Sequence, residues 1–264
     1  MNRFLSSPWT KAVLFLLALV PLGVLVWLVW EAYRTGNPTD YVSANPIEYI
    51  THYTGDWTIR FICFTLCITP LRMLLNRPQI TRFRRMLGLF AFFYGCLHFT
   101  VWVVLDPRQN TIPAIWDDIV NRRYITVGML AFLAMLPLAI TSTAGWVRRL
   151  TFKRWKKLHR LVYLTAIAGV IHYWWLVKSD IRLPLMYAAI VTVLLGYRII
   201  SWMRKRKPVV DRTPQPTVST SQSATGAVNS VGVAQPLPLR VEPALPRNCV
   251  PGAWPCTARR RPDG

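Results

Sequence analysis

Long apolar runs separated by clusters of basic residues occupy the first 207 residues of this 264-residue chain. Hydrophobic residues make up 53% of the chain and charged residues only 16%, whereas soluble domains carry about 25% charged residues. Each run is long enough to cross a bilayer core as a helix, which takes roughly 20 residues. We therefore predict an all-α integral membrane protein, with a six-helix transmembrane bundle in residues 1–207. The predicted spans are residues 12–30, 57–75, 86–105, 124–147, 158–177 and 183–200.

Basic residues gather on one side of this predicted bundle. Because cytoplasmic loops carry an excess of Lys and Arg, this side is predicted to be the cytoplasm, and both termini are predicted to lie there. The net charge of +21 then follows from topology, and we expect no nucleic-acid partner. The basic side holds Arg3, Lys11, the arginines of 72–85, the cluster of 148–160 and residues 204–207, and the other side holds Arg34, Arg108, Arg122, Arg123, Lys178 and Arg182.

The composition changes after Pro208. Residues 208–264 are rich in Pro, Ser, Thr, Val and Arg without a helical period, which predicts a disordered cytoplasmic tail. Cys249 and Cys256 lie in this tail, and we assign them no role. Cys63 and Cys67 lie one helical turn apart in an apolar run, where small core residues are the favoured interpretation. The cysteines show no zinc-binding or disulfide spacing.

Two histidines fall at matching depths in the apolar runs. An imidazole in a lipid-spanning helix costs free energy unless it has a partner, so each is a functional candidate. His98 lies about 18 Å and His172 about 21 Å from the cytoplasmic starts of their runs, at about 1.5 Å per helical residue. Two facing imidazoles at one depth are what a six-coordinate haem b requires, and a helix bundle places such cofactors in its interior. The alternative is a pair of core histidines hydrogen-bonded to the backbone or to each other.

The other two histidines fit several roles. His159 lies at the cytoplasmic boundary of its span, about 140° around a straight helix from His172. It can ligate a second, inner haem, help hold a flavin or quinone, or cap the bundle. A second iron ligand for an inner haem would have to come from the third span, at the positions of Arg84 and Arg85. Arginine suits a haem propionate or an anionic cofactor but does not ligate iron, so one haem is expected. His52 is expected to be exposed at the outer interface, with quinone or partner contact as the alternative.

Six segments together resemble the MsrQ (YedZ) family of the ferric-reductase and NADPH-oxidase transmembrane superfamily. They are HYTGDW (52–57), ITPLR (68–72), RRMLGLF (84–90), GCLHFTVW (95–102), LHRLVYL (158–164) and IHYWWLVKSD (171–180), within about residues 8–205. The resemblance implies a haem b subunit of the bacterial inner membrane with an FMN cofactor. It implies functional histidines at His98, His159 and His172.

The resemblance also implies partners. Electrons would come from quinols or a cytosolic flavin reductase and pass to MsrP, a periplasmic molybdopterin enzyme that reduces methionine sulfoxide in oxidised envelope proteins. The chain departs from the family in its long tail, and it lacks the paired histidines on the third helix that the superfamily uses for two haems. No nucleotide-binding domain follows the sixth span, so direct NADPH oxidation is not expected.

We therefore expect an electron-transfer subunit without catalytic residues of its own. A second redox interpretation is a quinone-linked cytochrome b that serves another dehydrogenase. The alternative from another class is a non-redox membrane transporter or scaffold. Proton-coupled transporters often use intramembrane carboxylates, and the predicted spans contain none. Arg60, near one end of the second predicted span, is expected to extend its side chain to the interface.

Overall fold

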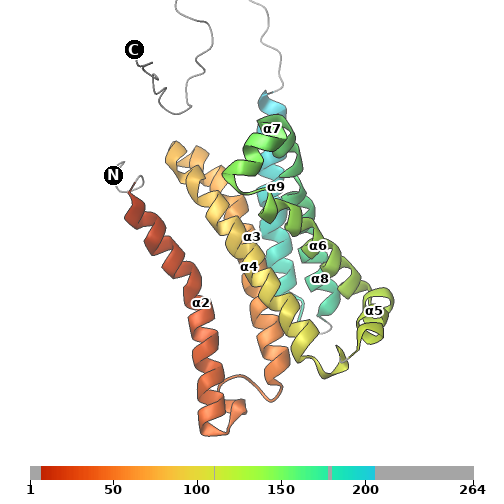
Figure 1. Cartoon of the computed structure of the whole chain (residues 1–264). Coiled ribbons are helices and arrows are strands. Elements are labelled where there is room, and N and C mark those ends of the chain that lie inside the picture. Colours follow the sequence, from red (N-terminus) through yellow and green to blue (C-terminus); the bar gives the residue numbers. More distant parts are fainter. Residues whose placement is uncertain (1–6, 110, 178–179, 206–264) are drawn as a thin grey trace, which may run out of the picture. The chain divides into compact units, whose positions relative to one another are not determined.

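The computed structural model of the chain describes residues 7–109, 111–177 and 180–205, and every regular element among them is a helix (Figure 1). Five helices are long and apolar enough to cross a membrane, which confirms a multi-pass membrane protein. They are α2 (Pro8–Thr35), α3 (Pro46–Leu74), α4 (Thr81–Leu105), α6 (Arg123–Ile140) and α9 (Arg182–Lys205). The predicted fifth span is the apolar but shorter α8 (Leu161–Leu176), so the count of six stays a prediction. The predicted tail, 208–264, lies outside the described residues.

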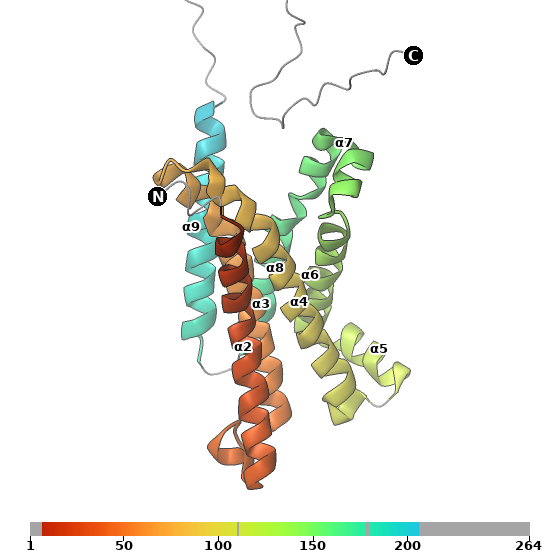
Figure 2. The same cartoon turned by 60° about the vertical axis from the view of Figure 1, so that its left-hand side comes forward.

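The long helices run alternately up and down (Figures 1 and 2). The closest pairs are α3 with α4 and α6 with α8, and α9 packs against both α3 and α8. One end of the bundle, here called the basic end, contains the start of α2, the end of α9 and the basic helix α7 (Ala144–Leu158). The opposite end contains the short helix α5 (Ile112–Asn121) and the 3-10 turns η1 (Pro38–Asp40) and η3 (Pro107–Gln109). A third such turn, η2 (Pro78–Ile80), leads into α4.

Helix α3 begins earlier than the predicted span at 57. The Asn45 side chain accepts a hydrogen bond from the Glu48 backbone N–H at 3.3 Å, and Pro46 occupies the first helical position, where its missing N–H costs nothing. Asp56 therefore lies inside this apolar helix, one residue before the predicted span, and its side chain is half-buried. Arg60 is about four helical turns from the start of α3 rather than near its end.

The predicted fourth and fifth spans are three helices. Helix α6 ends at Ile140 instead of 147, and the residues from Ala144 onward form α7, whose backbone is irregular at Thr151 (φ 59°). His159 ends α7, and Arg160 precedes α8. The predicted span 158–177 is therefore interrupted by a turn at its start, and the angle between His159 and His172 on one straight helix does not apply.

Aromatic packing between α3 and α4 forms the core. Phe61 stacks on Tyr94 with ring centroids 5.2 Å apart. The fully buried Tyr94 hydroxyl donates to the Ala18 carbonyl at 2.9 Å and accepts from the Leu22 N–H at 3.1 Å, so it bridges the backbone of α2 beside Pro21. Cys63 belongs to this core as predicted, but Cys67 is exposed.

Candidate functional site

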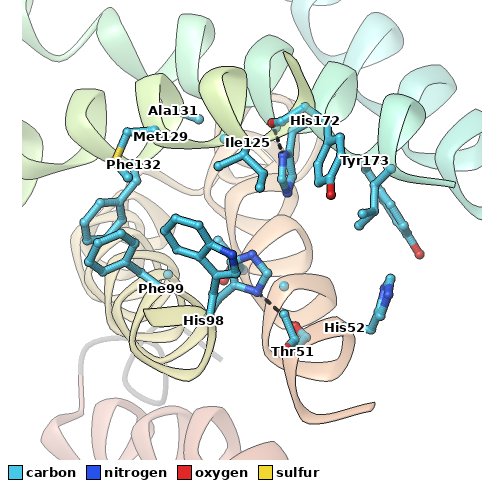
Figure 3. Close-up of a pocket in the computed structure, with 18 of the residues that line it drawn as sticks. Thr51, His52, His98, Phe99, Ile125, Met129, Ala131, Phe132, His172 and Tyr173 are labelled. Carbon is cyan, nitrogen blue, oxygen red and sulfur yellow. Dashed lines mark hydrogen bonds between the residues drawn. The ribbon is translucent and has the colours of Figure 1, made fainter. Parts of the chain in front are cut away.

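A cavity of about 1070 Å³ lies between α3, α4, α6 and α8, and Figure 3 shows side chains that line it. His98 from α4 and His172 from α8 both line it, with ring centroids 6.2 Å apart and planes at 81°. The predicted depth match therefore brings these two rings together. Apolar side chains form much of the remaining wall, among them Phe99, Ile125, Met129, Ala131 and Phe132.

The backbone of a neighbouring helix holds the ring of His98. Its Nδ1 lies 2.9 Å from the Thr51 carbonyl of α3. The ring also lies against Gly55, where a Cβ atom would be 3.0 Å from the imidazole Cε1. A glycine one turn along from the carbonyl therefore lets the imidazole approach α3 closely.

His172 is held in the same way by α6. Its Nδ1 lies 2.6 Å from the Tyr124 carbonyl, and a Cβ atom at Gly128 would be 2.6 Å from that same nitrogen. Real Cβ atoms essentially never approach so closely, so the ring occupies space that any side chain at 128 would need. Each histidine thus has one carbonyl and one glycine on the facing helix, four residues apart.

This anchoring determines the tautomer of both rings. A backbone carbonyl only accepts, so Nδ1 carries the proton in each ring and Nε2 keeps its lone pair for a metal. An imidazole nitrogen lies about 2 Å from a bound metal, which puts two rings on opposite sides of one ion roughly 6 Å apart between centroids. The observed 6.2 Å and the apolar walls fit an iron held in a flat macrocycle between the two rings. Among the described ranges, no three His, Cys, Asp or Glu side chains gather as a metal-ion site.

Charged residues at the mouth of the cavity are paired. Arg108 contacts Asp106 at 2.7 Å, and Arg122 contacts Asp118 at 2.9 Å. The hydrogen bond from Arg108 lowers the pKa of Asp106, so this carboxylate stays ionised near neutral pH. His52 lies at the rim, 3.9 Å from Glu48, and its side chain is 42% exposed.

A polar group on α3 forms another part of the wall. Asp56 lines the cavity and lies 3.5 Å from Arg60, whose Nε donates to the Tyr187 hydroxyl of α9 at 3.0 Å. The Arg60 guanidinium also lies over the Trp57 ring, 4.8 Å from its centroid. A charged pair inside an apolar helix requires such partners, which here tie α3 to α9.

His159 is separate from the cavity. Its ring packs on Trp155 at 4.1 Å between centroids, and its Nδ1 lies 3.2 Å from the Trp155 carbonyl. It lies at the basic end, within electrostatic range of Arg84. The structure thus brings His98 and His172 together and leaves His159 apart from them.

Two arginines, Arg84 and Arg198, lie near His159. Together with Tyr163 and Thr69, which accept hydrogen bonds from Arg198, they are here called the arginine cluster. Arg198 donates to the Tyr163 hydroxyl at 2.8 Å and the Thr69 hydroxyl at 2.8 Å. Arg84 lies within electrostatic range of Arg198, and the Nε of Arg198 is buried without a hydrogen-bond partner. Neither arginine pairs with a carboxylate in the part of the chain that the structure describes. Adjacent guanidinium groups without a counter-charge suit an anionic ligand.

The sequence analysis did not identify Thr51, Gly55, Tyr124 and Gly128 as site residues. Thr51 and Tyr124 hold the histidines through backbone carbonyls, which side-chain patterns do not reveal. An isolated glycine inside an apolar run, such as Gly128, is a usable signal because it indicates close approach by another group.

Comparison with known proteins identifies relatives along most of the chain. Residues 54–170 match the family described as "Ferric reductase like transmembrane component". The chain is 45% identical over 206 residues to the protein-methionine-sulfoxide reductase heme-binding subunit MsrQ of Xanthomonas euvesicatoria, covering 78% of this chain and 93% of the relative. It is 48% identical over 200 residues to that of Herminiimonas arsenicoxydans, covering 75% and 88%. No solved structure gives a significant match.

Proposed function

The chain belongs to the ferric-reductase-like MsrQ family of heme-binding subunits of protein-methionine-sulfoxide reductases, and from this premise we propose that it binds one haem b between His98 and His172 and transfers electrons across the bacterial inner membrane. The observation that carries the proposal is the pair of imidazoles, each anchored through Nδ1 and 6.2 Å apart. When bound, haem supplies one-electron ferric–ferrous chemistry. His98 and His172 would hold the haem iron through Nε2, and the carbonyls of Thr51 and Tyr124 hold the two rings through Nδ1.

The topology follows from the distribution of charge. We place the basic end in the cytoplasm, where Lys and Arg are in excess, with both termini on that side. Every acidic residue that the structure describes lies toward the opposite half of the bundle. Helix α8 then also crosses the membrane, as the fifth of six crossings, because α6 ends at the basic end and α9 begins at the other.

The arginine cluster is the proposed site for the phosphate of FMN. Arg84 and Arg198 have no carboxylate partner among the described residues. The buried Nε–H of Arg198 has no hydrogen-bond acceptor and is therefore free to donate to a ligand. A phosphate accepts charge-assisted hydrogen bonds from both guanidinium groups. This places the flavin at the basic end, accessible to a cytosolic flavin reductase, with His159 beside it.

The electron path has a donor and an acceptor on opposite sides. Electrons enter from a quinol or from a cytosolic flavin reductase through FMN. They leave at the opposite end to the periplasmic molybdopterin reductase MsrP, which supports repair of oxidised periplasmic proteins. The chain's own residues bind and orient the cofactors, so no catalytic side chain is required. Family membership favours this path over a cytochrome b for another dehydrogenase and over a non-redox transporter.

The first experiment is the dithionite-reduced minus oxidised spectrum of the purified full chain, with haem quantified per chain. We expect about one haem b per chain with sharp low-spin bands. A colourless protein after haem-supplemented expression would overturn the proposal. Two haems per chain would require a second ligand set that includes His159.

The donor and acceptor are tested on the same preparation. A quinol, or NADPH with a flavin reductase and FMN, should reduce the haem of the full chain in vesicles. Adding MsrP with methionine sulfoxide should then reoxidise it, while MsrP without sulfoxide should reoxidise it only to the extent that the molybdenum centre takes up electrons. Failure of MsrP to change the haem spectrum would remove this partner and leave the haem assignment intact.

A further inference from the structure

Helix α5 presents an exposed apolar stripe at the end of the bundle opposite the basic end. Ile112 is 82% exposed, Trp116 is 68% exposed and Val120 is 58% exposed. These residues recur every four positions, so they share one side of the helix. Large apolar side chains this exposed need a partner of their own.

The other sides of α5 have distinct environments. Asp118 is buried, accepts a hydrogen bond from Gln109 at 2.5 Å and pairs with Arg122, which fixes the rotation of the helix about its axis. Asp117 and Asn121 are exposed, and the Asn121 amide donates to the Asp117 carboxylate at 2.6 Å; they lie roughly 100–140° around the helix from the middle of the stripe. The helix therefore has a protein-facing side, a polar side and an apolar side.

The position of α5 makes lipid the natural partner of its apolar side. The helix connects two membrane-spanning helices and packs against the start of α6. At about 15 Å it is too short to cross a bilayer. The end of the membrane-spanning helix α4, which precedes α5 in the chain, also exposes apolar side chains, with Val104 68% and Leu105 45% exposed.

We propose that α5 is an interfacial helix that lies in the lipid headgroup layer, with Ile112, Trp116 and Val120 inserted toward the acyl chains and Asp117 and Asn121 in water. An amphipathic helix at a membrane surface buries its apolar side in this way, and tryptophan is enriched at that depth. Since the charged residues of α5 are both acidic, the contact relies on apolar burial and not on anionic lipid.

A protein partner fits this stripe less well. Three side chains offer a few hundred Å², whereas a stable interface buries about 800 Å² on each partner. The stripe also lies on the side of α5 away from Asp118, whose partner Arg122 lines the cavity.

The lipid contact has a route to the histidine cavity, and this part rests on the proposed function. Arg122 joins Asp118 of α5 to the Tyr124 hydroxyl, at 2.9 and 3.3 Å. The Tyr124 carbonyl in turn holds His172. A membrane contact that holds α5 in place therefore also steadies the residue that orients one axial ligand.

Spin labels test the proposal in phosphatidylcholine vesicles. The labels are placed by Trp116→Cys and Val120→Cys, and by Asp117→Cys as the matched control, in a full-length chain whose five cysteines are replaced by serine. We expect at least a several-fold higher ratio of oxygen to nickel-chelate accessibility at 116 and 120 than at 117, unchanged when anionic lipid is added. Equal accessibility at 116 and 117 would overturn the proposal. Chelate access at 116 that disappears only when the partner reductase is added would also overturn it, in favour of protein docking.

A second measurement does not depend on the cysteine-free background. A photoreactive benzophenone amino acid is placed at 116 or 117 in the chain with its native cysteines, in vesicles. Illumination should give a phospholipid adduct by mass spectrometry at 116 and little at 117. Absence of a lipid adduct at 116 would contradict the proposal whatever the haem content, so this outcome is independent of the haem assignment.

Discussion

The histidine cavity and the arginine cluster are built on opposite principles. In the cavity, each imidazole is anchored by a carbonyl and given space by a glycine, and the arginines at its mouth are paired with carboxylates. At the basic end a single histidine, His159, lies beside two arginines that have no carboxylate partner in the described ranges. The first arrangement suits a metal between neutral ligands, and the second suits an anion.

This difference argues that the chain holds two cofactors of different kinds. A second haem at the basic end would need another ligand facing His159. Among the described residues, Arg84 lies within electrostatic range of His159, and arginine does not ligate iron. In the proposed function, the two sites would serve successive stages of one electron path, with an anionic flavin at the basic end and the haem further along.

The largest effect should come from removing either cavity histidine. His98→Ala or His172→Ala leaves the iron one axial ligand short, so the low-spin haem spectrum should be lost. His159→Ala should keep about one haem per chain, since its ring lies outside the cavity. The measurement is haem per chain together with the reduced minus oxidised spectrum.

His52→Ala is the control for a general effect of losing a histidine at the cavity rim. Its side chain lines the rim at 42% exposure and pairs only weakly with Glu48, so the spectrum should not change. Full haem content with an unchanged spectrum in His98→Ala would refute the assignment of the ligands.

Filling the glycine spaces should have the next largest effect. Gly128→Ala places a methyl group 2.6 Å from the Nδ1 of His172, so the ring must move from its carbonyl. Overpacking of this kind costs about 1–3 kcal/mol, which corresponds to a fall of roughly 5- to 150-fold in haem affinity. Gly55→Ala, with a 3.0 Å contact at the edge of the His98 ring, should have a smaller effect. Haem titration of the apo-protein measures both.

Gly95→Ala is the matched control. Its added methyl group would meet Thr58 and Met135 at ordinary distances of 3.7 and 3.8 Å, although Gly95 also lines the cavity. Haem affinity in this variant should stay within about twofold of the parent. An equal loss in Gly95→Ala and Gly128→Ala would show that the cavity tolerates no change at all and that the glycines have no specific role.

Much of the fold was predictable because hydrophobic runs and basic clusters report directly on helices and topology. The match in depth between His98 and His172 was predictable for the same reason, since helical rise converts sequence position into distance. Helix boundaries were less accurate: the polar start of α3 up to Asp56 is stabilised by the Asn45 cap and tertiary contacts, which hydropathy does not measure. The turn at His159–Arg160 was missed because it lies at the very start of the apolar run, where hydropathy does not distinguish a turn from the first turn of a helix.

The anchoring of the site was not predictable in the same way. Thr51 and Tyr124 act through carbonyl groups that every residue has, so no residue type marks them. The arginine cluster joins Arg84 and Arg198, which are far apart in the sequence, and only the packing of α4 and α9 brings them together. Sequence patterns indicated that arginines near the basic end suit an anion, but they did not identify which ones.

Replacing the arginines should weaken the anion site without affecting the cavity. Charge-assisted hydrogen bonds contribute about 1.5–3 kcal/mol, so Arg198→Gln should lower FMN affinity roughly 10- to 100-fold. Arg84→Gln should also lower FMN affinity. Haem content should not change in either variant. Arg85→Gln, an exposed neighbour on the same helix, should leave FMN affinity nearly unchanged. Loss of haem but not of FMN in Arg198→Gln would reverse the assignment of the two sites.

The smallest effect concerns the paired charges at the cavity mouth. The hydrogen bond from Arg108 lowers the pKa of Asp106 below its ordinary value of about 3.9. The native state therefore gains stability from this carboxylate above that value and loses it as the pH falls through the lowered pKa. The pair is partly exposed, so it contributes about 0.2–1 kcal/mol. Asp106→Asn should lower the unfolding temperature slightly at pH 7 and leave it equal to the parent's once the pH is below the lowered pKa. A difference that persists undiminished at that pH would mean that Asp106 acts through packing rather than charge.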